Sequence, residues 1–235
     1  MMRKFLTAEW RDLIMVNYEV DPSMLADRIP SGTRLDLNYD KCFVSLVGFM
    51  FRDTRVLGFL IPFHVNFEEV NLRFYVTRDA GNEVRRGVVF IKEIVPGFAI
   101  AAVARTLYGE PYERWLMNHL RTETQIQYTW ERDSCKNSLD VSVGESLGVP
   151  ASGSHGEFII EHYWGYTKRG NDRTDEYKVE HPKWELFSVE NPRIEVDFSR
   201  TYGDKFAFLN EQRPFSVLLA KGSEISVYKG SPIRH

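Results

Sequence analysis

The 235-residue sequence has only two cysteines, no long apolar run and no excess of positive charge, and each shortage excludes a class of protein. Cys42 and Cys135 stand far apart and outside any Cys/His cluster, so neither a disulfide framework nor a metal site is expected. No apolar run approaches the roughly 20 residues that cross a bilayer. Charged residues within the first ten positions do not fit a signal peptide. The sequence therefore predicts no membrane association and a cytoplasmic location.

The sequence also lacks the features that most nucleic-acid-binding and cofactor-binding proteins share. The formal net charge is -3, so the chain lacks the basic surface that binds phosphate backbones, and no nucleic-acid partner is expected. The glycine-containing stretches 144–148 and 153–156 lack a phosphate-binding lysine and a strand–loop–helix setting. A nucleophile elbow is also missing. We therefore expect neither a cofactor nor a metal, while a homo-oligomer stays open.

Apolar and aromatic residues, by contrast, are plentiful at 43% and 14%. This composition suits a folded domain with a substantial core. Strand-like segments are spread over residues 1–235 without a repeat or a linker, which favours a single domain. Since closure removes exposed sheet edges, many strands with few helices predict a mainly β (α+β) fold built on a closed antiparallel β-barrel or cone. Strands are expected at residues 10–20, 33–39, 42–51, 64–77, 86–94, 122–131, 138–143, 157–166, 176–179, 184–189, 193–198 and 223–229.

Two stretches depart from this pattern of strands. Asp21 followed by Pro22 predicts the start of a short helix, because aspartate caps a helix and proline suits its first position. Residues 144–156 are rich in glycine and serine, which predicts a mobile surface loop. The strand at 42–51 is apolar on both faces, so we expect it to be buried on both sides.

Residues 97–120 form the most unusual stretch. An alanine-rich run predicts a buried helix, because nothing on it prefers water. Arg105 lies near the end of this helix and needs a partner there, either a ligand or a buried carboxylate. Gly109 and Pro111 then break the chain into a turn that holds Tyr112, and such turns commonly place residues that act on a ligand.

The strand at residues 64–77 carries the clearest cluster of polar side chains. Period-two geometry places Glu69, Asn71, Arg73 and Tyr75 on one face and apolar residues on the other. Two interpretations are open. Either the polar face is exposed to solvent, as in many antiparallel sheets, or it lines a barrel interior where these groups converge on a small ligand.

A second cluster falls at residues 158–166 and 179–184. As a strand, the first segment would place Glu161 and Tyr163 on one face and His162 on the other. His181 precedes a proline, which favours a hydrogen-bonded structural residue, although a histidine beside a cavity can also act as an acid or base near neutral pH. No pair of histidines has the spacing of zinc ligands.

Several of these segments resemble successive landmarks of the YqjF-like family of uncharacterised bacterial proteins, known as domain of unknown function 2071. The segments are Glu-Val-Asn-Leu-Arg-Phe-Tyr-Val (69–76), Ala104-Arg105 with Tyr108 and Pro111-Tyr112, Phe-Ile-Ile-Glu-His-Tyr (158–163) and His-Pro-Lys-Trp (181–184). The similarity covers most of the chain. It implies the fold of acetoacetate decarboxylase, a closed β-barrel or cone with a central cavity.

The resemblance also bears on chemistry. In acetoacetate decarboxylases, a lysine in a Gly-x-Pro-Lys-Lys turn forms a Schiff base with the substrate ketone. The similar turn here runs from Gly109 to Glu113, so that Tyr112 and Glu113 stand where the two lysines would be. Neither residue can form an imine. The resemblance therefore implies a cavity without the decarboxylase mechanism.

Three functional hypotheses remain. The favoured one is a barrel that binds a small polar or carboxylate-bearing molecule. The second is an enzyme that uses Glu69 or Glu161 as a general base and Tyr112 as an acid. The third is a structural or interaction protein without a ligand, in which Arg105 pairs with a buried carboxylate. The predicted ligand-binding residues are Arg73, Tyr75, Arg105, Tyr112, Tyr163 and His181.

Overall fold

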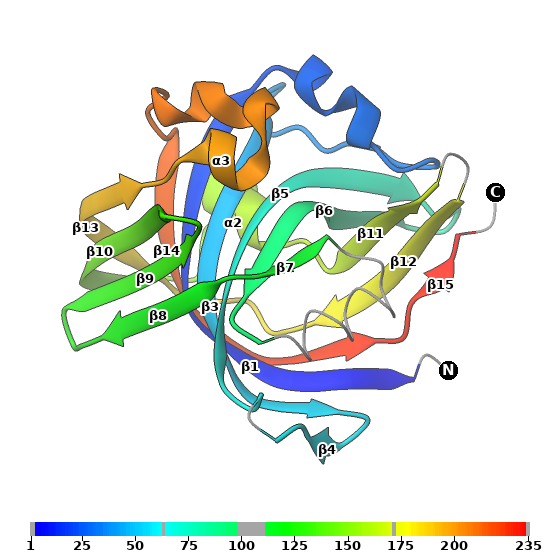
Figure 1. Ribbon diagram of the computed structural model, residues 1–235. Coiled ribbons are helices and arrows are strands. Elements are labelled where there is room, and N and C mark those ends of the chain that lie inside the picture. Colours follow the sequence, from blue (N-terminus) through cyan, green and yellow to red (C-terminus); the bar gives the residue numbers. More distant parts are fainter. Residues whose placement is uncertain (1–2, 63, 98–110, 171–172, 234–235) are drawn as a thin grey trace.

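Strands dominate the computed structural model (Figure 1), which describes residues 3–62, 64–97, 111–170 and 173–233. The strands are β1 (Lys4–Val20), β2 (Arg34–Leu35), β3 (Cys42–Val56), β4 (Phe59–Leu60), β5 (Phe67–Asp79), β6 (Val84–Val95), β7 (Tyr112–Arg114), β8 (Leu116–Arg121), β9 (Gln125–Arg132), β10 (Cys135–Gly148), β11 (Trp164–Arg169), β12 (Arg173–Glu180), β13 (Leu186–Glu195), β14 (Ser216–Tyr228) and β15 (Ser231–Pro232). The helical segments are η1 (Pro22–Arg28), α2 (His155–Ile160), α3 (Phe198–Tyr202) and η2 (Asp204–Asn210). No helix within these described ranges is long and apolar enough to cross a membrane.

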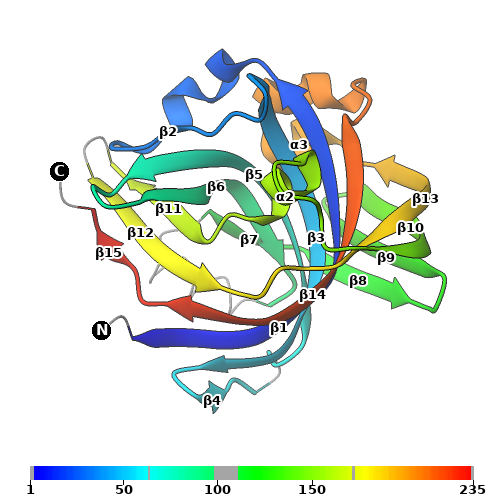
Figure 2. The same ribbon diagram turned by 180° about the vertical axis from the view of Figure 1, so that it is seen from behind.

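The strands close into a ring in the order β12–β11–β6–β5–β3–β1–β14, and β14 pairs back with β12 (Figures 1 and 2). Neighbours in the ring are antiparallel except β11 and β6, which are parallel. The closing pair is short, because only Val179–Val227 and Glu180–Ser226 are in register. The predicted mainly β, closed architecture is therefore confirmed, with one parallel step in the ring.

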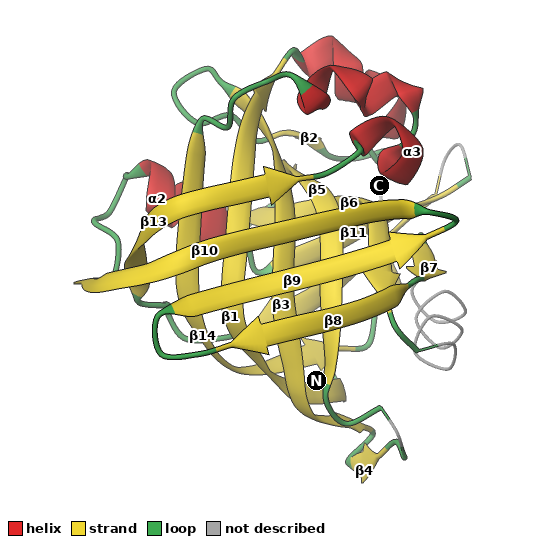
Figure 3. Ribbon diagram, turned by 60° about the vertical axis from the view of Figure 1, so that its left-hand side comes forward, coloured by secondary structure: helices red, strands yellow, loops and turns green. Residues whose placement is uncertain are grey.

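A second layer covers the outside of the ring. Strands β13, β10, β9 and β8 continue from β14, turn back and cross over β1, β3 and β5 (Figure 3). Apolar side chains from both layers pack between them, including Ile14, Leu46 and Leu72 from the ring and Tyr128 and Leu139 from the covering strands. Strand β3 is consequently buried on both faces, as its uniformly apolar sequence predicts.

Helix α2 lies inside the ring and fills part of its interior (Figure 2). Phe158, Ile159 and Ile160 are buried in the same core cluster as the inward side chains of β1, β3 and β12. The strand expected at 157–166 is thus wrong in its first half, which belongs to helix α2. The loop expected at 144–156 is wrong in its first part, because β10 continues to Gly148. The Ser154 side chain accepts a hydrogen bond from the Glu157 backbone N–H and so caps the start of the helix. The apolar residues Phe158, Ile159 and Ile160 would not by themselves predict a helix here.

Other expected elements agree with the structure to different degrees. The helix after Asp21 is present as the 3₁₀ segment η1, and the Asp21 side chain caps it. The expected strand at 33–39 shrinks to β2, and the two strands expected at 184–198 are one strand, β13, followed by α3. The predicted helix that begins at Gly97, including Arg105, lies outside the described residues apart from its first residue.

Candidate functional site

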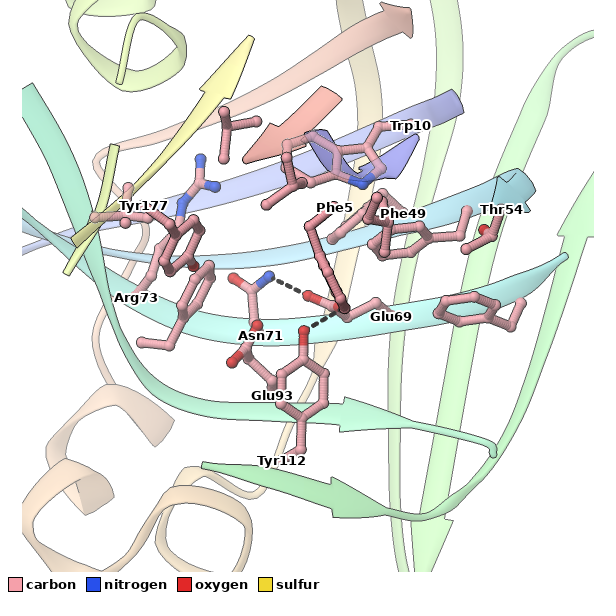
Figure 4. Close-up of a pocket in the computed structure, with 18 of the residues that line it drawn as sticks. Phe5, Trp10, Phe49, Thr54, Glu69, Asn71, Arg73, Glu93, Tyr112 and Tyr177 are labelled. Carbon is pink, nitrogen blue, oxygen red and sulfur yellow. Dashed lines mark hydrogen bonds between the residues drawn. The ribbon is translucent and has the colours of Figure 1, made fainter. Parts of the chain in front are cut away.

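The interior of the ring contains a cavity of about 120 Å³ (Figure 4). Its wall is mostly apolar and aromatic, with side chains such as Phe5, Trp10, Phe49, Phe67 and Phe90. A smaller group of polar or charged residues also borders it: Thr54, His64, Glu69, Asn71, Arg73, Glu93, Tyr112, His162 and Tyr177. An apolar cavity with a few converging polar groups is the usual form of a small-molecule site.

Strand β5 supplies three of these polar groups from one face. Glu69, Asn71 and Arg73 border the cavity, while Val70 and Leu72 pack in the outer core cluster. The alternation follows from the two-residue period of a strand. Of the two interpretations of this polar face, the structure thus agrees with the one that points it into the barrel.

Strand β6 supplies a further carboxyl group through a break in its alternation. Its register against β5 slips, because Arg73 faces Phe90 whereas the preceding Leu72 faces Lys92. Phe90 and Glu93 consequently both border the cavity. Lys92 points outward, where its Nζ donates to the Thr201 carbonyl at 2.6 Å and lies 2.9 Å from Glu113. Because of this β-bulge, the Glu93 carboxyl rather than the Lys92 amine faces the interior.

Glu69, Asn71 and Tyr112 form a hydrogen-bonded group in the wall (Figure 4). Asn71 Nδ2 donates to Glu69 Oε1 at 2.9 Å, and the Tyr112 hydroxyl donates to Glu69 Oε2 at 3.4 Å. Tyr112 reaches this position because β7 pairs in parallel with β6, opposite Glu93. Two carboxyl groups therefore flank one phenol.

Burial shifts the protonation of this group. It raises the pKa of Glu69 to about 7, although hydrogen bonds from Asn71 and Tyr112 and the positive charge of Arg73 act in the opposite direction. It also raises the pKa of Tyr112 well above its usual value, and the neighbouring Glu69 and Glu93 carboxyls add to that shift. Tyr112 thus remains a hydrogen-bond donor at neutral pH, whereas Glu69 can either hold or accept a proton.

Arg73 stands apart from the carboxyl groups. Its guanidinium lies 5.8 Å from the centre of the Tyr75 ring, and Nη2 is 4.0 Å from Met15 Sδ. Within the described ranges, Arg73 takes part in no salt bridge, and its buried Nε has no hydrogen-bond partner. A cation beside an apolar cavity without an acidic partner is costly unless something else completes its interactions.

His162 approaches the cavity from the segment after α2. Its Nε2 lies 3.0 Å from Asp36 Oδ2, and Arg86 Nε donates to the same oxygen at 2.7 Å. Burial lowers the pKa of His162 to about 4, against the opposing effect of Asp36. For Asp36, burial acts to raise the pKa, but the hydrogen bonds from His162 and Arg86 hold it below its usual value. Asp36 is thus ionised and the imidazole neutral at neutral pH.

The predicted site residues divide into three groups. Glu69, Arg73 and Tyr112 are among the residues that border the cavity. Tyr75 is not among the described wall residues, and its buried hydroxyl is 2.6 Å from Ser45 Oγ. Glu161, Tyr163 and His181 are not among the described residues of the cavity wall, and Arg105 lies outside the described residues.

The residues that miss the cavity form a separate arrangement. The Tyr163 hydroxyl donates to Glu161 Oε2 at 2.6 Å, and the His181 ring stacks between Tyr163 and Trp184 at centroid distances of 4.7 and 4.0 Å. Glu161 caps α2 and the chain is not a strand at this point, so the expected sharing of a strand face by Glu161 and Tyr163 is wrong. Burial lowers the pKa of His181 to about 4.

Sequence reasoning missed Glu93 and His162 as residues of the cavity wall. Regular alternation from Phe90 would have pointed Lys92 inward and Glu93 outward, and nothing in the residue types announces the bulge. The placement of His162 depends on α2, which the sequence did not predict. Among the described residues, no group of three His, Cys, Asp or Glu side chains is arranged to hold a metal ion.

Comparison with known proteins identifies relatives of the chain. Residues 7–224 match the model of a family described as "Uncharacterized conserved protein", DUF2071. The Uncharacterized protein YqjF of Bacillus subtilis (strain 168) is 25% identical over 185 residues, which cover 77% of this chain and 74% of YqjF.

Solved structures with a similar fold include several enzymes. The acetoacetate decarboxylase of Legionella pneumophila superposes with a TM-score of 0.68 at 12% identity, over 99% of this chain and 88% of that chain. The enduracididine biosynthesis enzyme MppR complexed with pyruvate gives 0.69 at 13% identity, over 99% and 91%. An acetoacetate decarboxylase-like enzyme from Sphingomonas wittichii RW1 gives 0.66 at 13% identity, over 98% and 94%. At these identities the similarity is one of fold.

Proposed function

Because the chain belongs to the DUF2071 family of uncharacterised conserved proteins, whose name assigns no reaction, we propose a function from its cavity: it binds a small carboxylate-bearing molecule inside the ring. The observation that carries the proposal is Arg73. Arg73 borders the cavity and has no acidic partner within the described ranges. A ligand carboxylate is the natural partner of such a group, because guanidinium and carboxylate can form two parallel hydrogen bonds.

Unpaired polar atoms around the cavity support the same function. Buried atoms without a hydrogen-bond partner belong to wall residues from separate parts of the fold: Trp10 Nε1, Thr54 Oγ1, Asn71 Oδ1, Arg73 Nε and His162 Nδ1. Buried polar atoms in native proteins are normally paired, so five unpaired atoms in the residues of one wall are unusual. A purely structural role gives no reason for this convergence.

The size of the cavity limits the ligand. A cavity of about 150 Å³ holds benzene, so the present one, at about 120 Å³, suits a molecule of about six non-hydrogen atoms. MppR, which has a similar fold, has been described in complex with pyruvate, a carboxylate of this size.

The proposal includes no Schiff-base step. Imine formation needs an amine in the cavity, and the described wall residues include no lysine. Lys92 faces away from the cavity, held by Thr201 and Glu113. The ligand is thus expected to bind reversibly, and borohydride treatment in the presence of pyruvate should leave the mass of the protein unchanged.

A second candidate function is acid–base catalysis on such a ligand, and it rests on Glu69. Burial raises its pKa to about 7, which suits a general base near neutral pH, and Tyr112 donates a hydrogen bond beside it. Exchange of solvent deuterium into the methyl group of pyruvate separates the two functions, because a protein that only binds does not accelerate it.

The test of binding uses propionate and its uncharged isostere propionamide, followed by calorimetry or ligand-observed NMR. We expect propionate to bind and propionamide to bind much more weakly. Arg73→Met should weaken propionate binding by about 10- to 100-fold, the value of a charge-assisted hydrogen bond. Arg34→Met, on an exposed arginine of β2, is the matched control and should leave binding unchanged. Equal binding of acid and amide, or no binding of either, contradicts the proposal.

A further inference from the structure

The surface that an occupant of the cavity meets is mostly hydrocarbon. Several apolar residues of the described wall are only half-buried: Leu6, Trp10, Val56, Ile61 and Phe90. The acid and amide groups lie deeper, because Glu69, Asn71 and Glu93 are 3%, 1% and 2% exposed. A molecule inside the cavity therefore touches mainly carbon atoms.

Arg73 is the exception, since it is charged and yet half-buried. Within the described ranges, no other arginine and no lysine borders the cavity. Burial lowers the pKa of His162 to about 4, so that this imidazole is neutral as well. The residue opposite Arg73 on β6 is Phe90, which means that apolar surface begins beside the strand position of the cation. The wall thus suits one negative charge with a hydrocarbon group next to it.

The remaining polar groups of the wall are occupied by one another. Asn71 Nδ2 donates to Glu69 Oε1 at 2.9 Å, and the Tyr112 hydroxyl interacts with both Glu69 and Glu93. A second carboxylate on a ligand would meet these acid groups without a second arginine to offset them. A hydroxyl or oxo group would exchange its hydrogen bonds with water for contacts with hydrocarbon, which costs free energy.

We infer that the ligand is a short monocarboxylic acid whose remainder is a hydrocarbon chain, with its carboxylate on Arg73 and its chain against the apolar wall. The inference rests on the proposed function, because Arg73 holds the carboxylate in both. A four-carbon acid such as butyrate or isobutyrate has six non-hydrogen atoms, which agrees with a cavity of about 120 Å³. Lactate has the same number of atoms and shape as isobutyrate, but a hydroxyl replaces one methyl group.

The test is a series of acids titrated into the wild-type protein by calorimetry. From acetate through propionate to butyrate, each added methylene should tighten binding by about threefold to fourfold. Hexanoate should bind no more tightly than butyrate, because its chain exceeds the space. Isobutyrate should bind about tenfold more tightly than either enantiomer of lactate, and malonate should bind more weakly than propionate.

A pair of variants at Phe90 locates the chain. Phe90→Gln places an amide beside Arg73, so it should weaken butyrate binding by about fivefold to tenfold and leave acetate binding nearly unchanged. Phe90→Leu keeps the surface apolar and should retain most of the affinity for butyrate. If Phe90→Gln weakens acetate and butyrate equally, the chain does not lie on this wall and the inference is wrong.

The acid series on the wild-type protein does not depend on how these variants fold. Equal affinities for acetate, propionate and butyrate, or lactate binding as tightly as isobutyrate, would overturn the inference and leave the proposed function in place. A gain that continues to hexanoate would also overturn it, since the chain would then bind outside the cavity. If no carboxylate binds at all, the proposed function fails together with it.

Discussion

At the scale of single residues, the unusual feature of this protein is a group of titratable side chains buried beside the cavity. Glu69 and Glu93 are 3% and 2% exposed, and Tyr112 lies between them. Arg73 is four residues from Glu69 along β5, and its positive charge offsets only part of the effect of burial on the Glu69 carboxyl. A charge on Glu69 is therefore expensive, which is why burial raises its pKa to about 7.

The raised pKa of Glu69 predicts how stability changes with pH. The folded protein holds this proton up to about pH 7, whereas the unfolded chain releases it near the ordinary value of 4.5. The stabilising contribution is thus complete below pH 4.5 and is lost as the pH rises through 7, by as much as about 3 kcal/mol. Glu69→Gln, which is always neutral, should therefore gain stability relative to wild type between pH 5 and pH 8.

Thermal unfolding at several pH values checks this prediction. The melting temperature of Glu69→Gln minus that of the wild type should rise by several degrees from pH 5 to pH 8. Glu123→Gln, an exposed position, is the control and should show a flat difference. A flat difference for Glu69→Gln as well would mean that Glu69 is ionised in the folded protein throughout this range.

At the scale of elements, strand β1 holds the two layers together through a local bend. Asp12 has a φ of 57°, and the register between β1 and β3 slips between Arg11 and Ile14. The covering strands secure this bend, because the Tyr128 hydroxyl donates to the Asp12 carbonyl at 2.9 Å and Arg121 Nε lies 3.2 Å from its carboxylate. On the other side of β1, Arg11 pairs with Gly222 of β14.

At Gly222, beside this bend, the backbone leaves no room for a side chain. Its φ is +75°, and a Cβ placed there would collide with the carbonyl group of Trp10. We expect Gly222→Ala to lower the free energy of unfolding by roughly 2–5 kcal/mol, the sum of a left-handed backbone and an overpacked contact. Denaturant unfolding measures the change.

Gly148 offers a matched control for Gly222. It has a similar φ of +70°, but nothing lies within 4 Å of the position of its missing Cβ. Gly148→Ala should therefore cost only about 1–2 kcal/mol, the backbone part alone. Equal losses at the two positions would show that the contact with Trp10 contributes nothing.

At the scale of the whole molecule, the ring closes through a short pairing of β12 with β14. Strands β1 and β3 pair over most of their length, whereas β12 and β14 share two register pairs and β11 and β6 share two. The closing strands also lie on the side that the second layer does not cover (Figures 1 and 3). The ring is thus held strongly on one side and weakly on the other.

Hydrogen exchange should reveal this asymmetry. Local opening takes the least free energy where few contacts and ladder bonds are lost. We expect the backbone amides of β12 to exchange faster than those of β3, as measured by mass spectrometry on proteolytic fragments. Uniform protection around the ring would indicate that the seam opens only when the whole protein unfolds.

The sequence was sufficient for those parts of the fold that depend on local periodicity. The inward polar face of β5 and the double burial of β3 follow directly from the order of residue types. The interior helix did not, because Phe158, Ile159 and Ile160 favour a strand by propensity and become helical through the Ser154 cap and tertiary packing.

The candidate site was predictable to a similar extent. Glu69 and Arg73 were found from a strand face, which is a local signal. Tyr112 was also found, although it begins strand β7 rather than lying in the predicted turn. Glu93 was missed because a bulge inverts the orientation of the residues after it, and His162 because its position depends on contacts with Asp36, 126 residues away in the chain. Long-range pairing of this kind leaves no periodic signal in the sequence.

The bulge in β6 also affects how related sequences should be aligned. Lys92 and Glu93 are adjacent in the chain, yet one faces α3 and the other the cavity. In a homologue whose strand ran without the bulge, the residue aligned with Lys92 would point inward instead. An insertion or deletion in this strand could therefore exchange a carboxyl for an amine in the cavity without any substitution, and a column-by-column comparison would not show the change.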